Sequence, residues 1–151
     1  MTIERLQAME ARVKELSAYP EQTLRRPYTP GKWSPRDIIG HLYYWDRYLL
    51  DSMLPAVQEG AVLPPFPHDD VFNQAALASL EGRSASWVME QFLDTREEVR
   101  QAFTGIGEDV TFSVRGSDEA WNRQLLVTMF ADHDEHHDTQ LAAFLDRERR
   151  S

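Results

Sequence analysis

The sequence contains no cysteine. This absence excludes disulfide bonds, thiolate nucleophiles and thiolate metal ligands together, so imidazole and carboxylate groups must hold any metal that this chain binds. Long apolar runs are also absent, since none approaches the roughly 18 residues needed to cross a bilayer. Residues 1–20 carry regularly spaced charges and no apolar segment, unlike a secretory signal. We therefore expect a soluble, cytoplasmic protein that does not enter membranes.

Basic residues are fewer than acidic ones. Lysine and arginine total 16 and aspartate and glutamate total 25, which gives a formal net charge of −9. A negative field disfavours nucleic-acid backbones and anionic membrane surfaces, and no dense basic patch opposes it, so neither is an expected partner. Hydrophobic residues make up 42% of the chain, enough for a packed core. With 151 residues, the sequence predicts a single domain over residues 1–151.

Helical spacing of apolar residues begins near the N-terminus. A first amphipathic helix, capped by Thr2 and ended by Tyr19-Pro20, is predicted through Leu6, Met9, Val13 and Leu16. A second helix is predicted to begin at Ser34-Pro35, because a capping hydroxyl followed by proline is typical of a helix start. It would end near Pro55 or Gly60, and its apolar side would consist of Ile38, Leu42, Trp45, Leu49 and Met53.

The segment 60–83 is predicted to be a long crossover, because its prolines oppose a continuous helix. Asp69 or Asp70 would cap a short helix inside it, through Phe72 to Leu80. Ser84 would begin a third helix that Gly105 ends, with an inner face made by Val88, Phe92, Thr95, Val99 and Phe103.

Residues 111–114 resemble a strand, but four residues without an obvious partner indicate it only weakly. A fourth helix is predicted from about Asp118 to Arg147, with one apolar side made by Leu126, Met129, Phe130, Leu141 and Phe144. Four amphipathic helices with a crossover between the second and third predict an all-α, four-helix bundle.

Three of the five histidines lie in the fourth predicted helix, at His133, His136 and His137. His133 and His137 are separated by about 40° around the helix axis and about 6 Å along it, so their rings leave the same face. That face also carries Phe130 and Phe144, so both rings should point into the core. His136 lies roughly 80° from the centre of this face, at its rim.

His41 of the second helix is the candidate third ligand, because bundles build metal sites from facing helices. Three imidazoles leave coordination positions open for water or substrate, which is typical of a catalytic site. Hydrogen-bonded core histidines without a metal are the alternative interpretation.

Several other polar residues are candidates for orienting the ligands or moving protons: Asp37, Tyr44, Asp46, Asp134 and His136. Taken singly, the aspartates and the tyrosine fit a solvated helix face better. His68, in the crossover, is interpreted as a surface residue.

Two segments resemble the DinB-like family of helical bundles, which includes bacillithiol transferases and mycothiol-dependent isomerases. Residues 31–42 resemble the family's W-S-x-x-x-x-x-x-H-L pattern, and residues 132–141 resemble its H-x-x-H-H-x-x-Q motif. The resemblance covers nearly the whole chain. It implies a bundle, often a homodimer, in which His41, His133 and His137 hold one divalent ion, commonly zinc or nickel. It also implies a small-molecule substrate, acted on either by a metal-dependent hydrolase or by a transferase that joins a low-molecular-weight thiol, as co-substrate, to an electrophile.

Three hypotheses for the function follow. The first is a metal-dependent thiol S-transferase or hydrolase that acts on a small electrophilic molecule. The second is a non-catalytic bundle that binds metal or serves as a stress-associated module. The third and weakest is a zincin-like peptidase, because His133-Asp134-x-x-His137 approximates the H-E-x-x-H pattern with Asp134 in place of the glutamate base.

Overall fold

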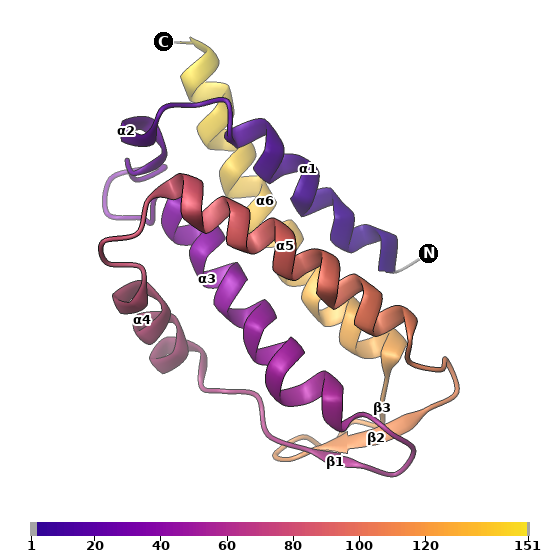
Figure 1. Cartoon of the computed structure of the whole chain (residues 1–151). Coiled ribbons are helices and arrows are strands. Elements are labelled where there is room, and N and C mark those ends of the chain that lie inside the picture. Colours follow the sequence, from indigo (N-terminus) through magenta and orange to yellow (C-terminus); the bar gives the residue numbers. More distant parts are fainter. Residues whose placement is uncertain (1–2, 151) are drawn as a thin grey trace.

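Four helices form the bundle in the computed structural model, which describes residues 3–150. They are α1 (Gln7–Leu16), α3 (Pro35–Tyr48), α5 (Ala85–Thr104) and α6 (Arg123–Arg150). Helices α1 and α6 run in one direction and α3 and α5 in the other (Figure 1). Because α3 and α5 are parallel, the chain must return along the bundle between them. Helix α4 (Asp69–Ser79) lies in this return, which confirms the predicted crossover.

Serine caps begin the two long helices that follow loops, as the sequence predicts. Ser34 Oγ accepts a hydrogen bond from the backbone N–H of Asp37 at 3.1 Å, and Ser84 Oγ accepts one from Trp87 at 3.0 Å. Helix α3 continues into a π-helical turn, η2 (Leu49–Met53), and a 3₁₀ turn, η3 (Leu54–Ala56), and so ends close to the predicted position.

The N-terminal region begins with a 3₁₀ turn, η1 (Ile3–Leu6), that leads into α1. Thr2, the predicted cap, lies outside the described residues. A short helix that the sequence did not predict, α2 (Glu21–Leu24), follows α1. The predicted aspartate cap of α4 is wrong, because His68 occupies the N-cap position and makes no side-chain capping bond.

The segment predicted as a weak strand is β2 (Thr111–Val114), and it does have partners. It pairs in parallel with β1 (Val62–Leu63) and antiparallel with β3 (Trp121–Asn122), which gives the described part of the chain a sheet of order β1-β2-β3. This sheet covers one end of the bundle (Figure 1). Each partner is only two residues long, too short for a period-two pattern to appear in the sequence.

Helix α6 begins later than the predicted Asp118, because Trp121 and Asn122 belong to the sheet. Asn122 Oδ1 accepts a hydrogen bond from the backbone N–H of Leu125 at 2.8 Å and so satisfies one of the free donors of the first turn. No helix within residues 3–150 is long and apolar enough to span a membrane.

Buried apolar side chains fill the bundle on both sides of a charged layer. Ile38 and Phe92 belong to the group near the start of α3, and Phe103 and Leu126 belong to the group beside the sheet. Arg96 of α5 lies between these groups, with its side chain 1% exposed. The predicted inner face of α5 is therefore correct, but the sequence did not indicate this arginine at its centre.

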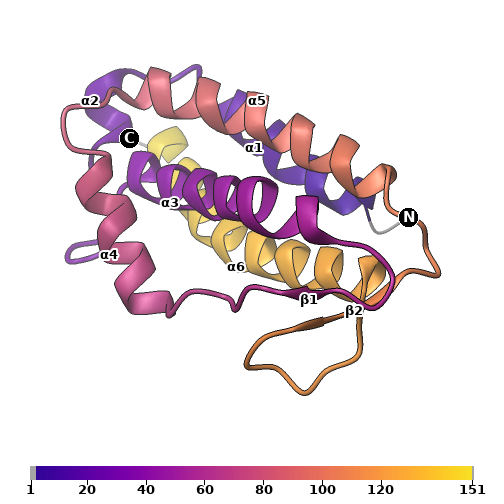
Figure 2. The same cartoon turned by 60° about the horizontal axis from the view of Figure 1, so that its bottom comes forward.

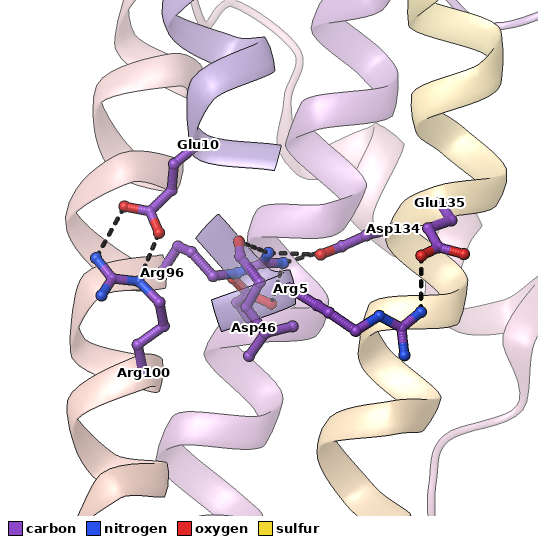
Figure 3. Close-up of polar contacts among 8 residues, drawn as sticks. Arg5, Glu10, Asp46, Arg96, Arg100, Asp134 and Glu135 are labelled. Carbon is purple, nitrogen blue, oxygen red and sulfur yellow. Dashed lines mark hydrogen bonds and ion pairs between the residues drawn. The ribbon is translucent and has the colours of Figure 1, made fainter. Parts of the chain in front are cut away.

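Arg96 forms bidentate ion pairs with two buried carboxylates. Its guanidinium donates to both oxygens of Asp46 in α3, at 2.7 and 3.1 Å, and to both oxygens of Asp134 in α6, at the same distances (Figure 3). It also donates to the carbonyl of Leu6 at 3.0 Å. Burial raises the pKa of Asp46 to about 6, although Arg96 opposes this rise. The interpretation of Asp46 and Asp134 as solvated helix-face residues is wrong.

Gly40 allows α4 to approach α3 closely. A Cβ at this position would clash with Cδ1 of Leu80, whose side chain is fully buried, so the packing there would have to shift. We expect Gly40→Ala to lower the free energy of unfolding by about 1–3 kcal/mol in urea titrations, despite the better helix propensity of alanine. Gly105→Ala is the control, since its nearest neighbour lies at 3.5 Å. Equal stability of the two variants would contradict this prediction.

Candidate metal centre

The structure brings His41, His133 and His137 together between α3 and α6. Figure 2 shows these two helices side by side. The ring centroids lie 5.4 Å apart for His41 and His133, 4.5 Å for His41 and His137, and 4.7 Å for His133 and His137. One ring nitrogen from each residue lies within 4.8 Å of the others. Helical spacing therefore placed the pair on α6 correctly, and α3 supplies the third ring as expected.

Hydrogen bonds fix which nitrogen two of these rings present. Nδ1 of His41 lies 2.6 Å from the carbonyl oxygen of Ile38, and Nδ1 of His137 lies 2.7 Å from Oε1 of Gln140. Because a carbonyl oxygen only accepts, each Nδ1 must carry the proton, and each Nε2 keeps its lone pair. Such a bond to the far nitrogen is typical of metal-ligating histidines.

Nε2 of His41 is a buried polar atom without a hydrogen-bond partner among residues 3–150. The ring is fully buried and contacts Trp33 edge-on, with centroids 4.7 Å apart, so water does not reach it from that side. An unpaired buried acceptor costs about 1–3 kcal/mol. A cation shared with His133 and His137 would remove this cost. The three ring nitrogens therefore fit a divalent metal site better than they fit the alternative interpretation of hydrogen-bonded core histidines.

Burial also keeps the three imidazoles neutral. It lowers the pKa of His41 well below the ordinary value, and the neighbouring His137 and His133 lower it further. Burial lowers the pKa of His137 to about 4, and it also lowers the pKa of His133. Neutral imidazole is the form that binds metal, so the site is ready for an ion at neutral pH without first losing protons.

The other predicted site residues lie outside this group. The Asp37 carboxylate pairs with Arg36 at 2.9 Å, and Tyr44 packs its ring against Tyr43. His136 is exposed at the rim, as predicted, with its ring centroid 4.9 Å from that of His137.

Asp134 does not lie in the position of a peptidase base. Both of its carboxylate oxygens accept hydrogen bonds from Arg96, and the residue is buried. A base that activates water needs a free lone pair at the reacting centre. The arrangement therefore disfavours the zincin-like hypothesis. His68 is exposed, in agreement with its interpretation as a surface residue.

A cleft of about 290 Å³ reaches the histidine cluster through His133. Its walls come from α3, the crossover, α4 and α6, and they include Trp45, Phe66, Asp69 and Phe130. Apolar walls beside converging polar groups are typical of a small-molecule site. Phe66 belongs to the segment 65–67, which the resemblance to the DinB-like family implies is an apolar loop near the pocket, and it does line the cleft. The sequence did not indicate Asp69 as a cleft residue, because the crossover that leads to it has no helical period to place it.

Gln140 orients His137 and is itself held by Tyr28. Its Nε2 donates to the Tyr28 hydroxyl at 3.3 Å while its Oε1 accepts from His137. We expect Gln140→Leu to weaken metal binding by about 10- to 100-fold, because the imidazole loses the group that fixes its tautomer and ring direction. Competition with a chromogenic chelator measures this affinity. Gln124→Leu, an exposed substitution near the start of α6, is the control. Unchanged affinity in Gln140→Leu would refute the role of this bond.

The fold and the converging histidines define a helical-bundle protein with a candidate divalent-metal centre. The family model described as the DinB superfamily matches residues 2–141, and the chain belongs to that superfamily. Among solved structures, the chain is similar to YfiT from Bacillus subtilis, with 16% identity and a TM-score of 0.64, over 99% of this chain and 85% of that one. YfiT is described as a probable metal-dependent hydrolase with an unusual four-helix bundle topology. No curated protein matches the sequence.

Proposed function

We propose that this protein is a metal-dependent enzyme that acts on a small electrophilic molecule, as a thiol S-transferase or a hydrolase. His41, His133 and His137 would hold one divalent ion, zinc or nickel. The observation that carries the proposal is the buried Nε2 of His41, which has no hydrogen-bond partner within residues 3–150 and lies close to two further imidazoles. One of these, His133, lines the cleft. The description of YfiT as a probable metal-dependent hydrolase supports the hydrolase form of this proposal.

The chain's own groups have separate tasks in this proposal. The three imidazoles would bind the ion, while Ile38 and Gln140 hold two of the rings in their metal-binding orientation. An ion bound by three neutral ligands supplies positive charge that lowers the pKa of a thiol or a water molecule placed beside it. Because the chain lacks cysteine, the thiol of a transferase reaction must come from a small co-substrate.

The requirement for a thiol separates the two reactions. For the transferase, we expect zinc- or nickel-loaded protein to accelerate the reaction of monobromobimane with added cysteine by at least about 10-fold, by analogy with other activated nucleophiles. Adduct fluorescence measures the rate, with His41→Ala as the inactive control. For the hydrolase, p-nitrophenyl acetate would turn over at full rate in thiol-free buffer. A metal-loaded protein that accelerates neither reaction would favour the non-catalytic bundle.

A homodimer and a cytoplasmic location remain predictions that accompany this proposal. Light scattering after size-exclusion chromatography measures the mass in solution, against 17.5 kDa for one chain. A mass of one chain at micromolar concentration would refute the dimer and leave the metal centre unaffected, because all three candidate ligands come from the same chain.

A further inference from the structure

The cleft beside the histidines has an unusual combination of walls. The aromatic rings of Trp45, Phe66 and Phe130 line it together with Met129, and Asp69 supplies a carboxylate. Lysine and arginine are absent from the described residues that line it. The cleft therefore has one negatively charged group, the Asp69 carboxylate, among aromatic rings whose faces attract cations.

The aromatic wall is held in place before any ligand binds. Nε1 of Trp45 donates to Oδ1 of Asn73 at 2.9 Å, which ties α3 to α4. The Trp45 ring also packs against Phe72, with centroids 4.3 Å apart. The Tyr48 hydroxyl donates to the carbonyl of Pro65 at 2.6 Å, which fixes the crossover against α3. Because these side chains are already ordered, little conformational entropy is lost when a ligand binds.

Asp69 supplies the carboxylate of this cleft, and its charge opposes the lowering of the pKa of His133. It forms no hydrogen bond or ion pair with the side chains of residues 3–150, whereas Asp46 and Asp134 are both occupied by Arg96. It also lies outside the group of atoms that could share a metal ion with the three histidines. The carboxylate oxygens of Asp69 are therefore available to form a hydrogen bond or an ion pair with a ligand.

We propose that the cleft binds a ligand with a positively charged ammonium group on an apolar, preferably aromatic, body. The ammonium would lie against Asp69 and the faces of the neighbouring rings, and the body would pack on Met129 and Phe130. A carboxylate combined with aromatic faces is the chemistry that recognises such cations. The net charge of −9 favours their approach. The absence of basic lining residues disfavours anionic ligands in the same place.

This inference deepens the proposed function and rests on it in one respect, since the reacting end of the ligand would lie at the histidines. The binding of the cation itself does not require a metal. Measurements on the full chain, both as purified and after metal removal, therefore test cation binding separately from metal binding. Failure to bind zinc or nickel would contradict the metal centre, while the preference for a cation in the cleft could still be measured.

Four probes of similar size test the proposal by isothermal titration calorimetry: phenethylammonium, benzyltrimethylammonium, phenethyl alcohol and hydrocinnamate. Benzyltrimethylammonium has no lone pair, so it cannot bind through a metal. We expect both cations to bind about 5- to 10-fold more tightly than the alcohol, and the anion to bind most weakly in metal-free protein. Asp69→Asn, which keeps the shape of the side chain, should remove this preference.

Asp70→Asn is the matched control, because Asp70 lies in the same exposed first turn of α4 but does not line the cleft. This variant should keep the preference for cations. The proposal is overturned if the cations bind no better than the alcohol or do not bind at all. It is also overturned if Asp70→Asn loses as much of the preference for cations as Asp69→Asn does, because the preference would then come from the overall negative charge of the protein. A loss of metal affinity in Asp69→Asn would instead assign this carboxylate to the metal.

Discussion

Replacing Arg96 with methionine is expected to lower the free energy of unfolding by about 3–5 kcal/mol. The substitution would leave the carboxylates of Asp46 and Asp134 buried within a bundle core without their counter-ion. Uncompensated charge in such surroundings is far more costly than the loss of a surface pair. Urea unfolding followed by circular dichroism measures the change.

The control for this prediction is Arg47→Met, which removes an exposed ion pair with Asp51 within one helix turn. That variant should differ from the wild type by less than about 1 kcal/mol. A triple variant that also replaces Asp46 and Asp134 with leucine should regain most of the stability, because an apolar cluster replaces the whole charged one. An Arg96→Met protein as stable as Arg47→Met would refute the account of the charged layer.

His41→Ala is expected to have the largest effect on metal binding. Loss of one of three ligands should weaken the affinity by more than about 100-fold, since removing even a partner of a ligand costs 10- to 100-fold. The bundle should remain folded, because the substitution also removes the buried Nε2 atom, which has no hydrogen-bond partner among the described residues and destabilises the metal-free protein. Elemental analysis of tag-free protein gives the metal content per chain, and far-ultraviolet circular dichroism checks the helices.

His68→Ala serves as the matched control, because His68 is exposed and precedes α4, away from the group of three rings. It should keep the metal content and any turnover of the wild type. Equal metal content in His41→Ala and His68→Ala would mean that the ion is held elsewhere. Loss of helical signal in His41→Ala would instead indicate that the histidine has a structural role.

The arrangement of the histidines could be predicted because helix geometry fixes it. His133 and His137 are four residues apart, so they share a face wherever that helix lies, and Phe130 and Phe144 identify the face as inward. His41 required the assumption that α3 packs beside α6, which the bundle topology supplied. Metal binding by these three residues stays a prediction until it is measured.

Arg96 could not be predicted, because its position on the inner face of α5 conflicts with the usual exposure of arginine. Its burial depends on Asp46 and Asp134, which lie 50 and 38 residues away, and no local pattern joins residues so far apart. Asp69 was missed for a related reason. Its place in the first turn of α4 suggested a helix cap, and only the path of the crossover brings it beside His133.

The strand pairing was missed because the parallel partner of β2 lies in the crossover. Val62 pairs with Ser113 and Leu63 with Val114, contacts that depend on the whole intervening chain. Short strands that pair over such distances leave little trace in a local sequence pattern, whereas long helices show a clear apolar period. The sequence therefore predicted the bundle and the histidines well, and it predicted the structures at the end of the bundle poorly.

The most direct test of the metal centre is an anomalous difference map from crystals of the wild-type protein grown with zinc, recorded above and below the zinc edge. We expect one strong peak per chain among the Nε2 atoms of His41, His133 and His137, at about 2.0–2.1 Å from each nitrogen. A peak confined to surface carboxylates or to His136, or the absence of a peak at the three histidines, would contradict the central claim.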